Sequence, residues 1–415
     1  MRILCVSLNF FPELTGIGKY SGEMVAWLSL QGHELHIVTT PPYYPVWRVS
    51  EGYSANAYQI EPLGGSLVYR CPLWVPSLPG GLKRLIHLAS FALSSLPIML
   101  RQIFWKPDVV WMVAPAFFCA PGTWLTAKLS GAPAWIHVQD YEVDAAFDLG
   151  LLKGKLLRRM VLAVERWMFQ RFDVVSTISH RMLERAADKG VAANRLVLFP
   201  NWVDISSVRP EMRCDDFRAE LGAAPDQVIA LYSGNMGGKQ GLEILAQAAA
   251  LLQANLRLLF VFCGNGAGRA DLMAQCAGLP NVRFLDLQPL EKLGAMLASA
   301  DIHLLPQRAD AADLVMPSKL TGMLASGRAV VATAHVGTEV ARVVEGCGLV
   351  VPPENPRAFA DAIAALADDA EMRQRYGVAA RCYAEENLDK ETVLRRFEAE
   401  LIKLAQKSRS TAAIG

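Results

Sequence analysis

This chain alternates short apolar runs with amphipathic helical windows, and that alternation constrains its fold more than any other feature. Such alternation is typical of parallel α/β sheets. The pattern reaches about residue 200, pauses over a polar stretch and starts again near residue 228. The sequence therefore predicts an α/β protein with two doubly wound domains. Strands are predicted at Ile3–Ser7, Glu34–Thr39, Ser66–Cys71, Val109–Val113, Ala134–Val138, Val174–Thr177 and Leu196–Phe199, and then at Val228–Ser233, Leu256–Cys263, Val282–Leu285, Ile302–Leu305, Ala329–Ala332 and Leu349–Val351.

The expected domain boundaries follow from the restart of the pattern. Residues 1–205 are expected to form the first domain and residues 206–388 the second. Residues 389–415 contain no further strand. Within them, Lys390–Lys407 repeats apolar residues at helical spacing and is expected to pack by one face, while Ser408–Gly415 is expected to be a flexible tail.

Length and composition exclude several classes of protein. The chain has 415 residues, of which 52% are hydrophobic and 20% charged, so intrinsic disorder is excluded. Its net charge of +1 gives no overall field that would draw it to nucleic acid. The eight cysteines include no C-x-x-C pair, which favours buried reduced thiols in a cytosolic protein over zinc ligands or disulfides.

Two glycine-rich turns open the two halves in the same way. Each follows an apolar strand and precedes an amphipathic helix, at Gly16–Lys19 in the first half and Gly234–Gly241 in the second. Such turns let backbone N–H groups approach a phosphate closely, and open α/β sheets bind ligands at the carboxyl ends of their strands. A third turn, Gly264–Gly268, either lines a ligand or is a tight strand-to-helix turn. We therefore expect a phosphorylated ligand.

Two familiar phosphate motifs are disfavoured. Gly22 comes one position too late to complete G-x-G-x-x-G after Gly16 and Gly18, and the second strand ends without the acidic residue that holds a dinucleotide ribose. The Gly234–Lys239 turn is one residue short of a Walker loop, and Gln240 stands where Ser or Thr would coordinate magnesium. A nicotinamide or flavin enzyme and an NTPase are therefore poor interpretations.

Further motifs lie in register along the whole chain: Asn9–Glu13, Leu30–Thr39, Pro200–Asp204, Ser233–Asn235, Cys263–Gly266, Met316–Leu320 and Ala325–Ala332. Together they resemble the retaining glycosyltransferases of family 4. Leu305–Arg308 and Val315–Lys319 are similar to the bacterial colanic-acid (exopolysaccharide) biosynthesis subgroup. The resemblance implies the GT-B fold, in which an N-terminal acceptor-binding and a C-terminal nucleotide-sugar-binding Rossmann-like domain face a cleft. It also implies that the C-terminal helix packs back on the N-terminal domain.

The sequence departs from the family pattern at the site. Members of the wider family usually carry two glutamates spaced E-x7-E that contact the donor sugar and its ribose, but Leu314 and Gly322 occupy these positions here. The Arg and Lys that usually neutralise the diphosphate correspond to Asn235 and Gln240, and the loop His corresponds to Gln139. The catalytic groups therefore cannot be carried over from the family pattern.

A site can still be predicted from the remaining residues. A retaining transfer needs stabilisation of the leaving diphosphate more than a strong base, and Lys319 can supply charge beside the N–H groups of a helix start. Without a D-x-D motif or a placed carboxylate nucleophile, we expect a reaction that needs no metal or cofactor and returns the acceptor to the same face. The candidate catalytic residues are Asp140 and Lys319; the candidate donor-binding residues are Gly16, Gly18, Asn235, Lys239, Gln240, Gly264, Arg308, Ser318 and Lys319; the candidates on the acceptor and phosphate side are Lys19 and Gln139.

Several of these residues have an ordinary structural alternative. Lys19 could be a solvated helix residue, Asn235 a left-handed turn residue, and Asp140 a cap of the turn that follows it. His137, two positions before Gln139, lies inside an apolar strand and is more often a hydrogen-bonded core histidine.

Residues 82–106 form an apolar helical segment flanked by basic and aromatic residues, as an interfacial segment would be, and a basic cluster follows at residues 153–159. Residues 1–205 hold 19 Lys and Arg against 15 Asp and Glu, a charge of +4, while the remainder holds 22 against 25, a charge of −3. This asymmetry suits a peripheral protein on an anionic membrane leaflet. A long buried helix is the alternative.

The uncharged run from residue 109 to 127 is disfavoured as a membrane span because Pro115 and Pro121 break it.

The prediction is a metal-independent glycosyltransferase of the hexosyltransferase class that moves a sugar from a nucleotide-diphosphate sugar to a lipid-linked exopolysaccharide intermediate. The subgroup resemblance favours GDP-fucose as donor. The expected partners are this donor, a polyprenyl-diphosphate-linked saccharide and the surface of the inner membrane, on which a cytoplasmic protein would sit peripherally. The alternative, suggested by the missing carboxylates, is a non-catalytic nucleotide-sugar-binding or assembly subunit of a membrane polysaccharide complex.

Overall fold

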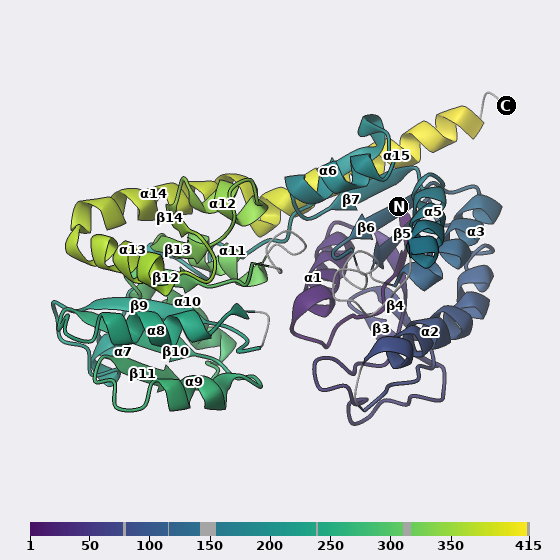
Figure 1. Cartoon of the computed structure of the whole chain (residues 1–415). Helices are drawn as coiled ribbons and strands as arrows, with labels where there is room; N and C mark the ends of the chain where they lie inside the picture. The colour runs from purple at the N-terminus through teal and green to yellow at the C-terminus, as the bar shows by residue number, and fades with distance from the viewer. Residues whose placement is uncertain (78–79, 115, 142–154, 238–239, 310–316, 413–415) are drawn as a thin grey trace. The chain divides into compact units, whose positions relative to one another are not determined.

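The computed structural model describes the chain except for residues 78–79, 115, 142–154, 238–239, 310–316 and 413–415 (Figure 1). The chain divides into two compact units. The N-terminal unit comprises Met1–Pro200 together with Leu394–Gly415, and the C-terminal unit comprises Asn201–Val393. Each unit is built on one sheet, and each is described by itself.

The sheet of the N-terminal unit has eight strands in the order β3-β4-β2-β1-β5-β6-β7-β8. Its inner strands are parallel and buried on both faces, which explains their nearly continuous apolar sequences. Only β3 is antiparallel to its neighbour among the described pairs. The strands are β1 Arg2–Val6, β2 Glu34–Thr39, β3 Gln59–Leu63, β4 Ser66–Arg70, β5 Val109–Ala114, β6 Ala134–Val138, β7 Val174–Thr177 and β8 Leu196–Leu198.

The helices of the N-terminal unit follow the strands as crossovers. Helix α2 buries one face, including Leu88, Phe91 and Met99, and leaves Leu82 and Leu93 exposed at 70% and 74%. Helix α2 is therefore not the long buried helix of the alternative, because part of its apolar surface is exposed. The helices are α1 Gly16–Leu30, α2 Gly81–Arg101, α3 Ala120–Ser130, α5 Lys155–Phe169 and α6 His180–Asp188, with short 3₁₀ turns at Phe117–Cys119 and Ala193–Arg195.

The sheet of the C-terminal unit has six parallel strands in the order β11-β10-β9-β12-β13-β14. Alternate residues of β9 point into two different apolar cores, since Ala230 lies in one and Leu231 in the other. The strands are β9 Val228–Ser233, β10 Leu258–Cys263, β11 Val282–Leu285, β12 Ile302–Leu305, β13 Ala329–Thr333 and β14 Gly348–Val351.

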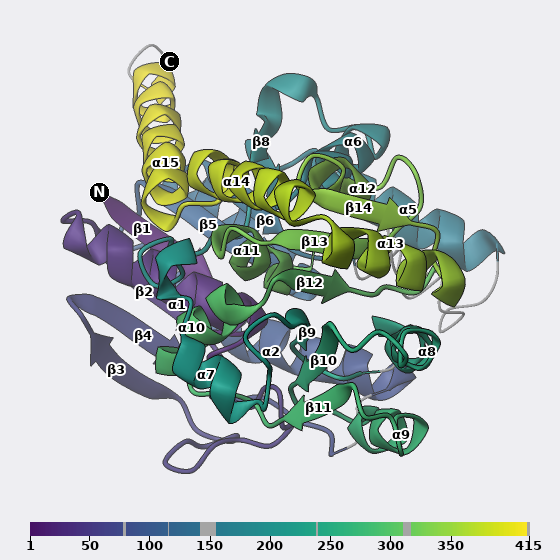
Figure 2. The same ribbon diagram turned by 90° about the vertical axis from the view of Figure 1, so that its left-hand side faces the viewer.

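Helices cover both faces of this second sheet (Figure 2). Residues of α8, α9 and α13 contribute to one core, and residues of α10, α11, α12 and α14 contribute to the other. Two layers of helices around a parallel sheet make this unit doubly wound. The helices are α7 Asp215–Glu220, α8 Glu243–Leu251, α9 Arg269–Gln275, α10 Leu290–Ser299, α11 Ser318–Ala325, α12 Glu339–Val344, α13 Pro356–Asp368 and α14 Ala370–Asn387, with a 3₁₀ turn at Pro210–Met212.

The last helix, α15 (Lys390–Ala412), belongs to the N-terminal unit from Leu394 onward. Its Phe397 ring stacks on Phe199 with centroids 4.2 Å apart and meets Trp135 edge-on at 5.2 Å. The expectation that the C-terminal helix packs back on the first domain is therefore confirmed. The predicted flexible tail from Ser408 is wrong as far as Ala412: an ion pair between Arg409 and Asp108 holds the last turns in the helix.

The predicted strands are confirmed, with ends that differ by at most two residues. Strand β3 was not predicted, because Pro62 and its polar neighbours give an exposed edge strand rather than a buried one. The thiols of Cys5 and Cys263 are buried and reduced as expected, whereas Cys382 is exposed.

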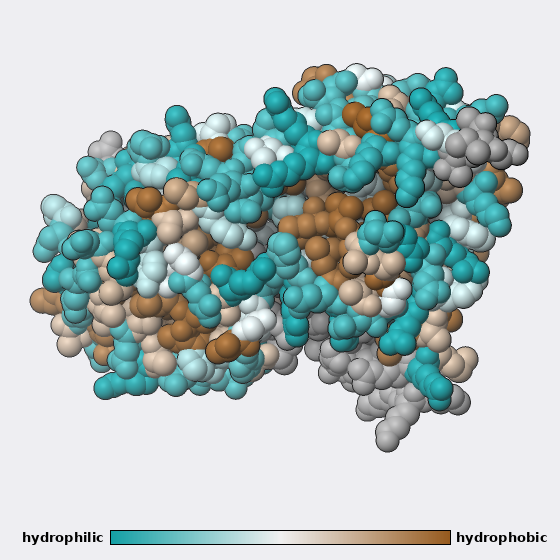
Figure 3. Space-filling model, turned by 90° about the horizontal axis from the view of Figure 1, so that it is seen from above, coloured by the Kyte–Doolittle hydropathy of each residue, from teal (hydrophilic) through white to brown (hydrophobic). Residues whose placement is uncertain are grey.

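Hydrophobic side chains lie in patches among mainly hydrophilic surface on the face seen in Figure 3. In the part of the chain that the structure describes, none of the helices combines the length and the hydropathy that crossing a bilayer requires.

Candidate functional site

The carboxyl ends of β9, β10 and β12 meet at one edge of the C-terminal sheet. Strand β9 runs into the turn that starts at Gly234, and β10 runs into the turn that starts at Gly264. Strand β12 is followed at the same edge by Gln307 and Arg308, and α11 begins at Ser318. The candidate donor residues Asn235, Gly264, Arg308 and Ser318 all follow strands of this edge or begin α11.

The two glycine turns interlock through their backbones. A Cβ on Gly264, which has φ +141°, would lie 1.9 Å from the carbonyl oxygen of Gly234. The N–H of Gly234 donates to the carbonyl of Cys263 (3.0 Å), and the N–H of Met236 donates to that of Asn265 (2.9 Å). Only glycine permits this approach, so Gly264 is required to build the turn whatever binds there.

Lys319 extends from the first turn of α11 towards the Gly234 turn. Its Nζ lies 4.3 Å from the ring centroid of Tyr232, and its Cδ comes within 3.3 Å of where a Cβ on Gly234 would stand. The Nζ is buried and has no hydrogen-bond partner among the described residues. Burial lowers the pKa of Lys319 from 10.5 to about 7. An enclosed ammonium with no counter-ion is an unfavourable arrangement that an anionic ligand would relieve.

The N-terminus of α11 adds donors to the same place. Ser318 is exposed, Pro317 precedes it, and no side chain caps the helix. The first N–H groups of a helix lack partners within it and carry the positive end of its dipole. Lys319 and these N–H groups together form an arrangement suited to a phosphate.

Three other predicted donor residues surround the Gly234 turn but are already engaged. Gln240 Oε1 accepts from the N–H of Gly237 (3.1 Å), which holds the turn closed. The carbonyl of Asn235 accepts from the buried Tyr232 hydroxyl (2.7 Å), so its backbone is part of the turn. Arg308 pairs with Glu243 at 3.0 Å, with both side chains about half exposed. Lys239 lies outside the described residues.

The predicted residues of the N-terminal unit lie at the carboxyl ends of β1 and β6. Gly16 and Gly18 begin α1, so these two predicted donor residues belong to the N-terminal unit. Lys19 follows them, 3.9 Å from Glu23, with its side chain 39% exposed. This position agrees with the alternative of a solvated helix residue. Gln139 and the half-buried Asp140 directly follow β6.

His137 is the core histidine of the structural alternative. Its Nδ1 is 2.9 Å from Ser176 Oγ, and its Nε2 is 3.1 Å from Gln139 Nε2. Burial lowers its pKa to about 3, so the ring is neutral and accepts from the Gln139 amide. Gln139 is thereby fixed at the strand end.

Glu13 is a buried carboxylate, and the sequence pointed to it only as part of the Asn9–Glu13 motif. It accepts from the N–H groups of Tyr43 (2.9 Å) and Tyr44 (2.8 Å) and from Asn9 Nδ2 (2.9 Å). Burial raises its pKa, and these donors offset part of the rise. Its Cβ lies 2.6 Å from where a Cβ on Gly18 would stand, so glycine is needed there for close packing. The carboxylate therefore ties the loop after β2 beneath the α1 turn.

Comparison with known proteins decides the family. Residues 15–202 match the Glycosyl transferase 4-like domain and residues 227–369 match Glycosyl transferases group 1. An Escherichia coli (strain K12) protein named as a colanic acid biosynthesis glycosyl transferase, WcaI, is 46% identical over 407 residues, covering 96% of this chain and 98% of its own. The chain belongs to the family 4 glycosyltransferases. The predicted resemblance to the colanic-acid subgroup is confirmed.

More distant relatives agree with this assignment. The D-inositol 3-phosphate glycosyltransferase of Nocardia farcinica is 32% identical over 207 residues, which cover 47% of this transferase and 45% of that chain. A sucrose-phosphate synthase from Thermosynechococcus elongatus superposes with a TM-score of 0.74 at 16% identity, covering 100% of both chains. The Anabaena protein HepE, solved in complex with UDP, superposes with a TM-score of 0.66 at 14% identity over 97% of this chain and 100% of that one. The predicted GT-B fold is confirmed.

The transferase has no carboxylate at the second of the two positions where the wider family carries glutamate. Gly322 occupies it, one turn after Ser318 in α11, and Leu314 at the first position lies outside the described residues. The described residues contain no group of three or more His, Cys, Asp or Glu that could hold a metal ion.

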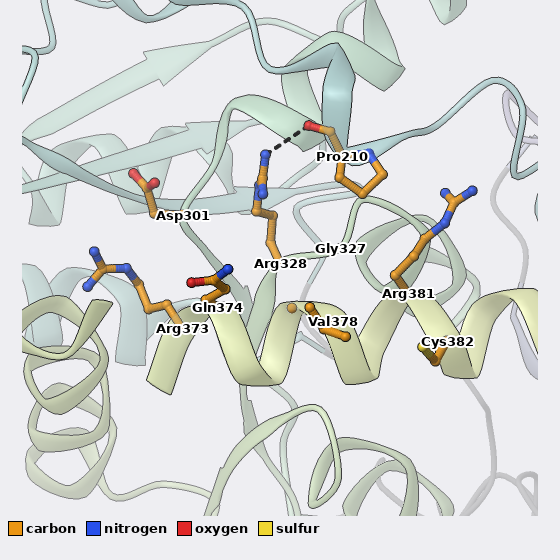
Figure 4. A pocket seen from close by; sticks show the side chains of 10 residues that line it. Pro210, Asp301, Gly327, Arg328, Arg373, Gln374, Val378, Arg381 and Cys382 are labelled. Atoms are coloured by element: carbon orange, nitrogen blue, oxygen red, sulfur yellow. Dashed lines mark hydrogen bonds between the residues drawn. The ribbon is translucent and has the colours of Figure 1, made fainter. Parts of the chain in front are cut away.

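A cavity of about 460 Å³ lies at the opposite, amino-terminal edge of the same sheet, where Asp301 and Arg328 precede β12 and β13 (Figure 4). Arg328 Nη2 donates to the carbonyl of Pro210 (3.0 Å). Arg373 and Arg381 also donate to backbone carbonyls. These arginines therefore hydrogen-bond to the backbone of loops and helix ends. Their cavity lies at the edge of the sheet opposite to the Lys319 turn.

Proposed function

We propose that the transferase binds a nucleotide-diphosphate sugar at the carboxyl edge of its C-terminal sheet, with the diphosphate against Lys319. The observation that carries this proposal is the enclosed Nζ of Lys319, which no described residue neutralises. The uncapped start of α11 supports it, because the first N–H groups of a helix can point at an anion. The UDP bound by HepE in its crystal structure agrees with this class of ligand.

The transfer we propose retains configuration and needs no metal. The bond between the sugar and the β-phosphate breaks, and its electron pair leaves with the diphosphate, whose growing charge is stabilised by Lys319 and the α11 amides. The acceptor oxygen forms its bond to the same face of the sugar, and its proton passes to the departing phosphate oxygen. Asp140 remains the second catalytic candidate, and Gln139 and Lys19 are assigned to the acceptor and phosphate side. Unchanged turnover in EDTA supports this proposal, and loss restored by a divalent cation contradicts it.

The donor base is tested by thermal shift of the full chain with GDP, UDP, ADP and dTDP. A ligand at about 100 times its dissociation constant stabilises by about 2.7 kcal/mol, which makes the preferred base visible without the acceptor. GDP-fucose is the first sugar donor to test, as a hexosyl donor suggested by the likeness to the colanic acid enzyme. Stabilisation by one base with wild type but not with Lys319→Met supports the proposal. No stabilisation by any of the four contradicts it.

The acceptor we propose is a polyprenyl-diphosphate-linked saccharide at the inner leaflet. Leu82 and Leu93 on α2 expose apolar surface, and Lys83 and Arg84 beside Leu82 are also exposed. Apolar anchors beside basic residues bind anionic bilayers. The second predicted basic cluster, residues 153–159, lies mostly outside the residues whose side chains the structure describes.

Liposome co-sedimentation tests this membrane contact. Lys83→Glu with Arg84→Glu is expected to abolish sedimentation with vesicles containing anionic lipid, because two attractive charges become repulsive. Lys292→Glu with Arg357→Glu makes the same charge change on the C-terminal unit and is the matched control. Equal sedimentation of both double variants contradicts peripheral binding through α2.

A non-catalytic nucleotide-sugar-binding or assembly subunit is the competing proposal, and Gly322 supports it because no carboxylate stands there. Turnover separates the two. Acceptor-dependent release of nucleoside diphosphate supports the enzyme, and nucleotide-sugar binding without release supports the subunit.

A further inference from the structure

A cavity of about 560 Å³ lies within the N-terminal unit. Its walls come from the loop after β2, the segment after β4 and one side of α2, and two tryptophans, Trp47 and Trp74, line it. This volume is within the range of pockets for small ligands, about 300–1,000 Å³. Two indole rings in one cavity make it a candidate for recognition of a ligand with flat apolar faces.

Trp47 is held in an unusual backbone conformation. Its φ is +56°, in a region that bulky residues rarely adopt. The ring contacts two buried residues, with centroids 5.5 Å from Tyr43 and 5.3 Å from His87. The surrounding structure therefore fixes this ring at the cavity wall.

Trp74 is fixed through its backbone. Its N–H donates to Ser90 Oγ (3.0 Å), and its carbonyl accepts from His87 Nδ1 (2.7 Å). His87 Nε2 accepts from the Tyr43 hydroxyl (2.9 Å). Burial lowers the pKa of His87, so the ring stays neutral and serves both contacts in one tautomer. The Trp74 side chain is nevertheless 45% exposed, which leaves its ring available to a ligand.

Three of the polar side chains at the same cavity have no hydrogen-bond partner among the described residues. Arg48, Asn56 and Ser77 line it, and none of the three side chains has a partner among the residues that the structure describes. The wall thus combines fixed aromatic rings with unengaged hydrogen-bond donors and acceptors. A pyranose presents the complementary surface, because its C–H faces pack on aromatic rings and its hydroxyl groups require polar partners.

We propose that this cavity binds pyranose rings of the acceptor saccharide, with Trp47 and Trp74 stacking on the sugar and Asn56 and Arg48 bonding its hydroxyl groups. The inference rests on the proposed function, since it names the acceptor's binding surface. Exposed Leu93 lies next to Ser94 on α2, and Ser94 lines the cavity, so an acceptor's lipid would find apolar surface beside its sugar. Acceptor specificity then resides in the rims at residues 47–56 and 72–77.

The test is saturation-transfer NMR of the full chain with a panel of methyl pyranosides, with acceptor KM and kcat measured in parallel. Trp74→Ala is expected to weaken sugar binding and raise the acceptor KM about tenfold, the effect of losing one stacking ring. Trp74→Phe keeps a ring and is expected to retain most of the binding. Asn56→Ala removes a side chain that makes no hydrogen bond to a described residue, so it is expected to leave the unfolding midpoint unchanged while it weakens sugar binding. Trp167→Ala, in α5, removes another tryptophan of similar exposure, 47%, outside the cavity and is the matched control.

The outcomes separate the inference from the proposed function. If Trp74→Ala and Trp167→Ala bind sugars and acceptor equally well while wild type turns over, the cavity is not the acceptor site. If a nucleoside diphosphate fails to stabilise wild type, the donor proposal fails whatever the cavity binds. Transfer of saturation to an alkyl glycoside's chain but not to its ring would make the cavity a lipid site and overturn the saccharide assignment.

Discussion

Lys319→Met removes a buried charge that has no partner among the described residues, so it should improve folding while it destroys donor binding. The pKa of Lys319 falls from 10.5 to about 7 on burial. One pKa unit corresponds to about 1.4 kcal/mol, so the charged form is disfavoured by up to about 5 kcal/mol in the folded protein. Methionine has a similar length and carries no charge.

Proton linkage gives the direction in which Lys319→Met changes the free energy of unfolding. The unfolded chain binds the Lys319 proton more tightly than the folded chain, so protonation opposes folding. The penalty is complete below pH 7 and fades as the pH rises from 7 towards 10.5. Lys319→Met is therefore expected to raise the free energy of unfolding of the ligand-free protein by up to about 5 kcal/mol near pH 6 and by about 1 kcal/mol near pH 10.

Equilibrium denaturation of wild type and variant at both pH values measures this difference. Lys292→Met, an exposed lysine of the same unit, controls for the loss of any lysine and should change stability little at either pH. A Lys319→Met variant that is no more stable than wild type near pH 6, or equally stabilised near pH 10, refutes the reasoning that Nζ is enclosed and unpartnered.

Raising the pH should weaken nucleotide binding, although it relieves the stability penalty of the buried lysine. A diphosphate requires the charged lysine, so wild-type affinity should fall about tenfold per pH unit above pH 7, as proton uptake accompanies binding. Lys319→Arg should remove this dependence because arginine stays charged. Calorimetric titration with the preferred nucleoside diphosphate at several pH values measures it, and a wild-type affinity that is constant across this range contradicts the assignment.

Three further predictions concern the framework of the two units. Gly264→Ala should lower the melting temperature of the C-terminal unit by several degrees and abolish nucleotide binding, because an added Cβ would lie 1.9 Å from a backbone oxygen; a stable, nucleotide-binding variant contradicts this. Glu165→Gln should destabilise the N-terminal unit by about 3–5 kcal/mol in denaturant, since Lys189 loses its buried partner, whereas Arg181→Ala, in an exposed pair, should cost under about 1 kcal/mol. Phe397→Ala should cost the same unit about 3–5 kcal/mol by the same measurement, because α15 loses its aromatic anchor; an unchanged midpoint would mean that the helix contributes nothing there.

Periodicity predicted most of the fold because both sheets are buried. Strands such as β9 and β12 are buried at every position and consist mostly of apolar residues, so their sequences alone predict them. Edge strand β3 carries Pro62 and exposed side chains, and its pairing depends on the hairpin with β4. The helical end of α15 was missed for a related reason, since Arg409 finds Asp108 some three hundred residues away in sequence.

Local sequence likewise predicts one part of the candidate site, and the other part depends on residues distant in sequence. The glycine turns and the position of Lys319 follow from local sequence, because a strand end, a turn and a helix start are all local features. The enclosure of the Lys319 ammonium depends on Tyr232 in β9, and the burial of Glu13 depends on the loop after β2. Sequence could not show either environment, nor that Arg308 is engaged by Glu243.

Release of nucleoside diphosphate from a nucleotide sugar, in the presence and absence of a lipid-linked saccharide acceptor, tests the proposed chemistry most directly. We expect that release by the wild-type chain requires the acceptor and persists in EDTA. Release should fall at least a hundredfold in Lys319→Met, because removing a group that stabilises the leaving diphosphate raises the activation free energy by about 2.7–4 kcal/mol. Nucleotide-sugar binding without any release, or equal release by wild type and Lys319→Met, would contradict a donor site built on Lys319.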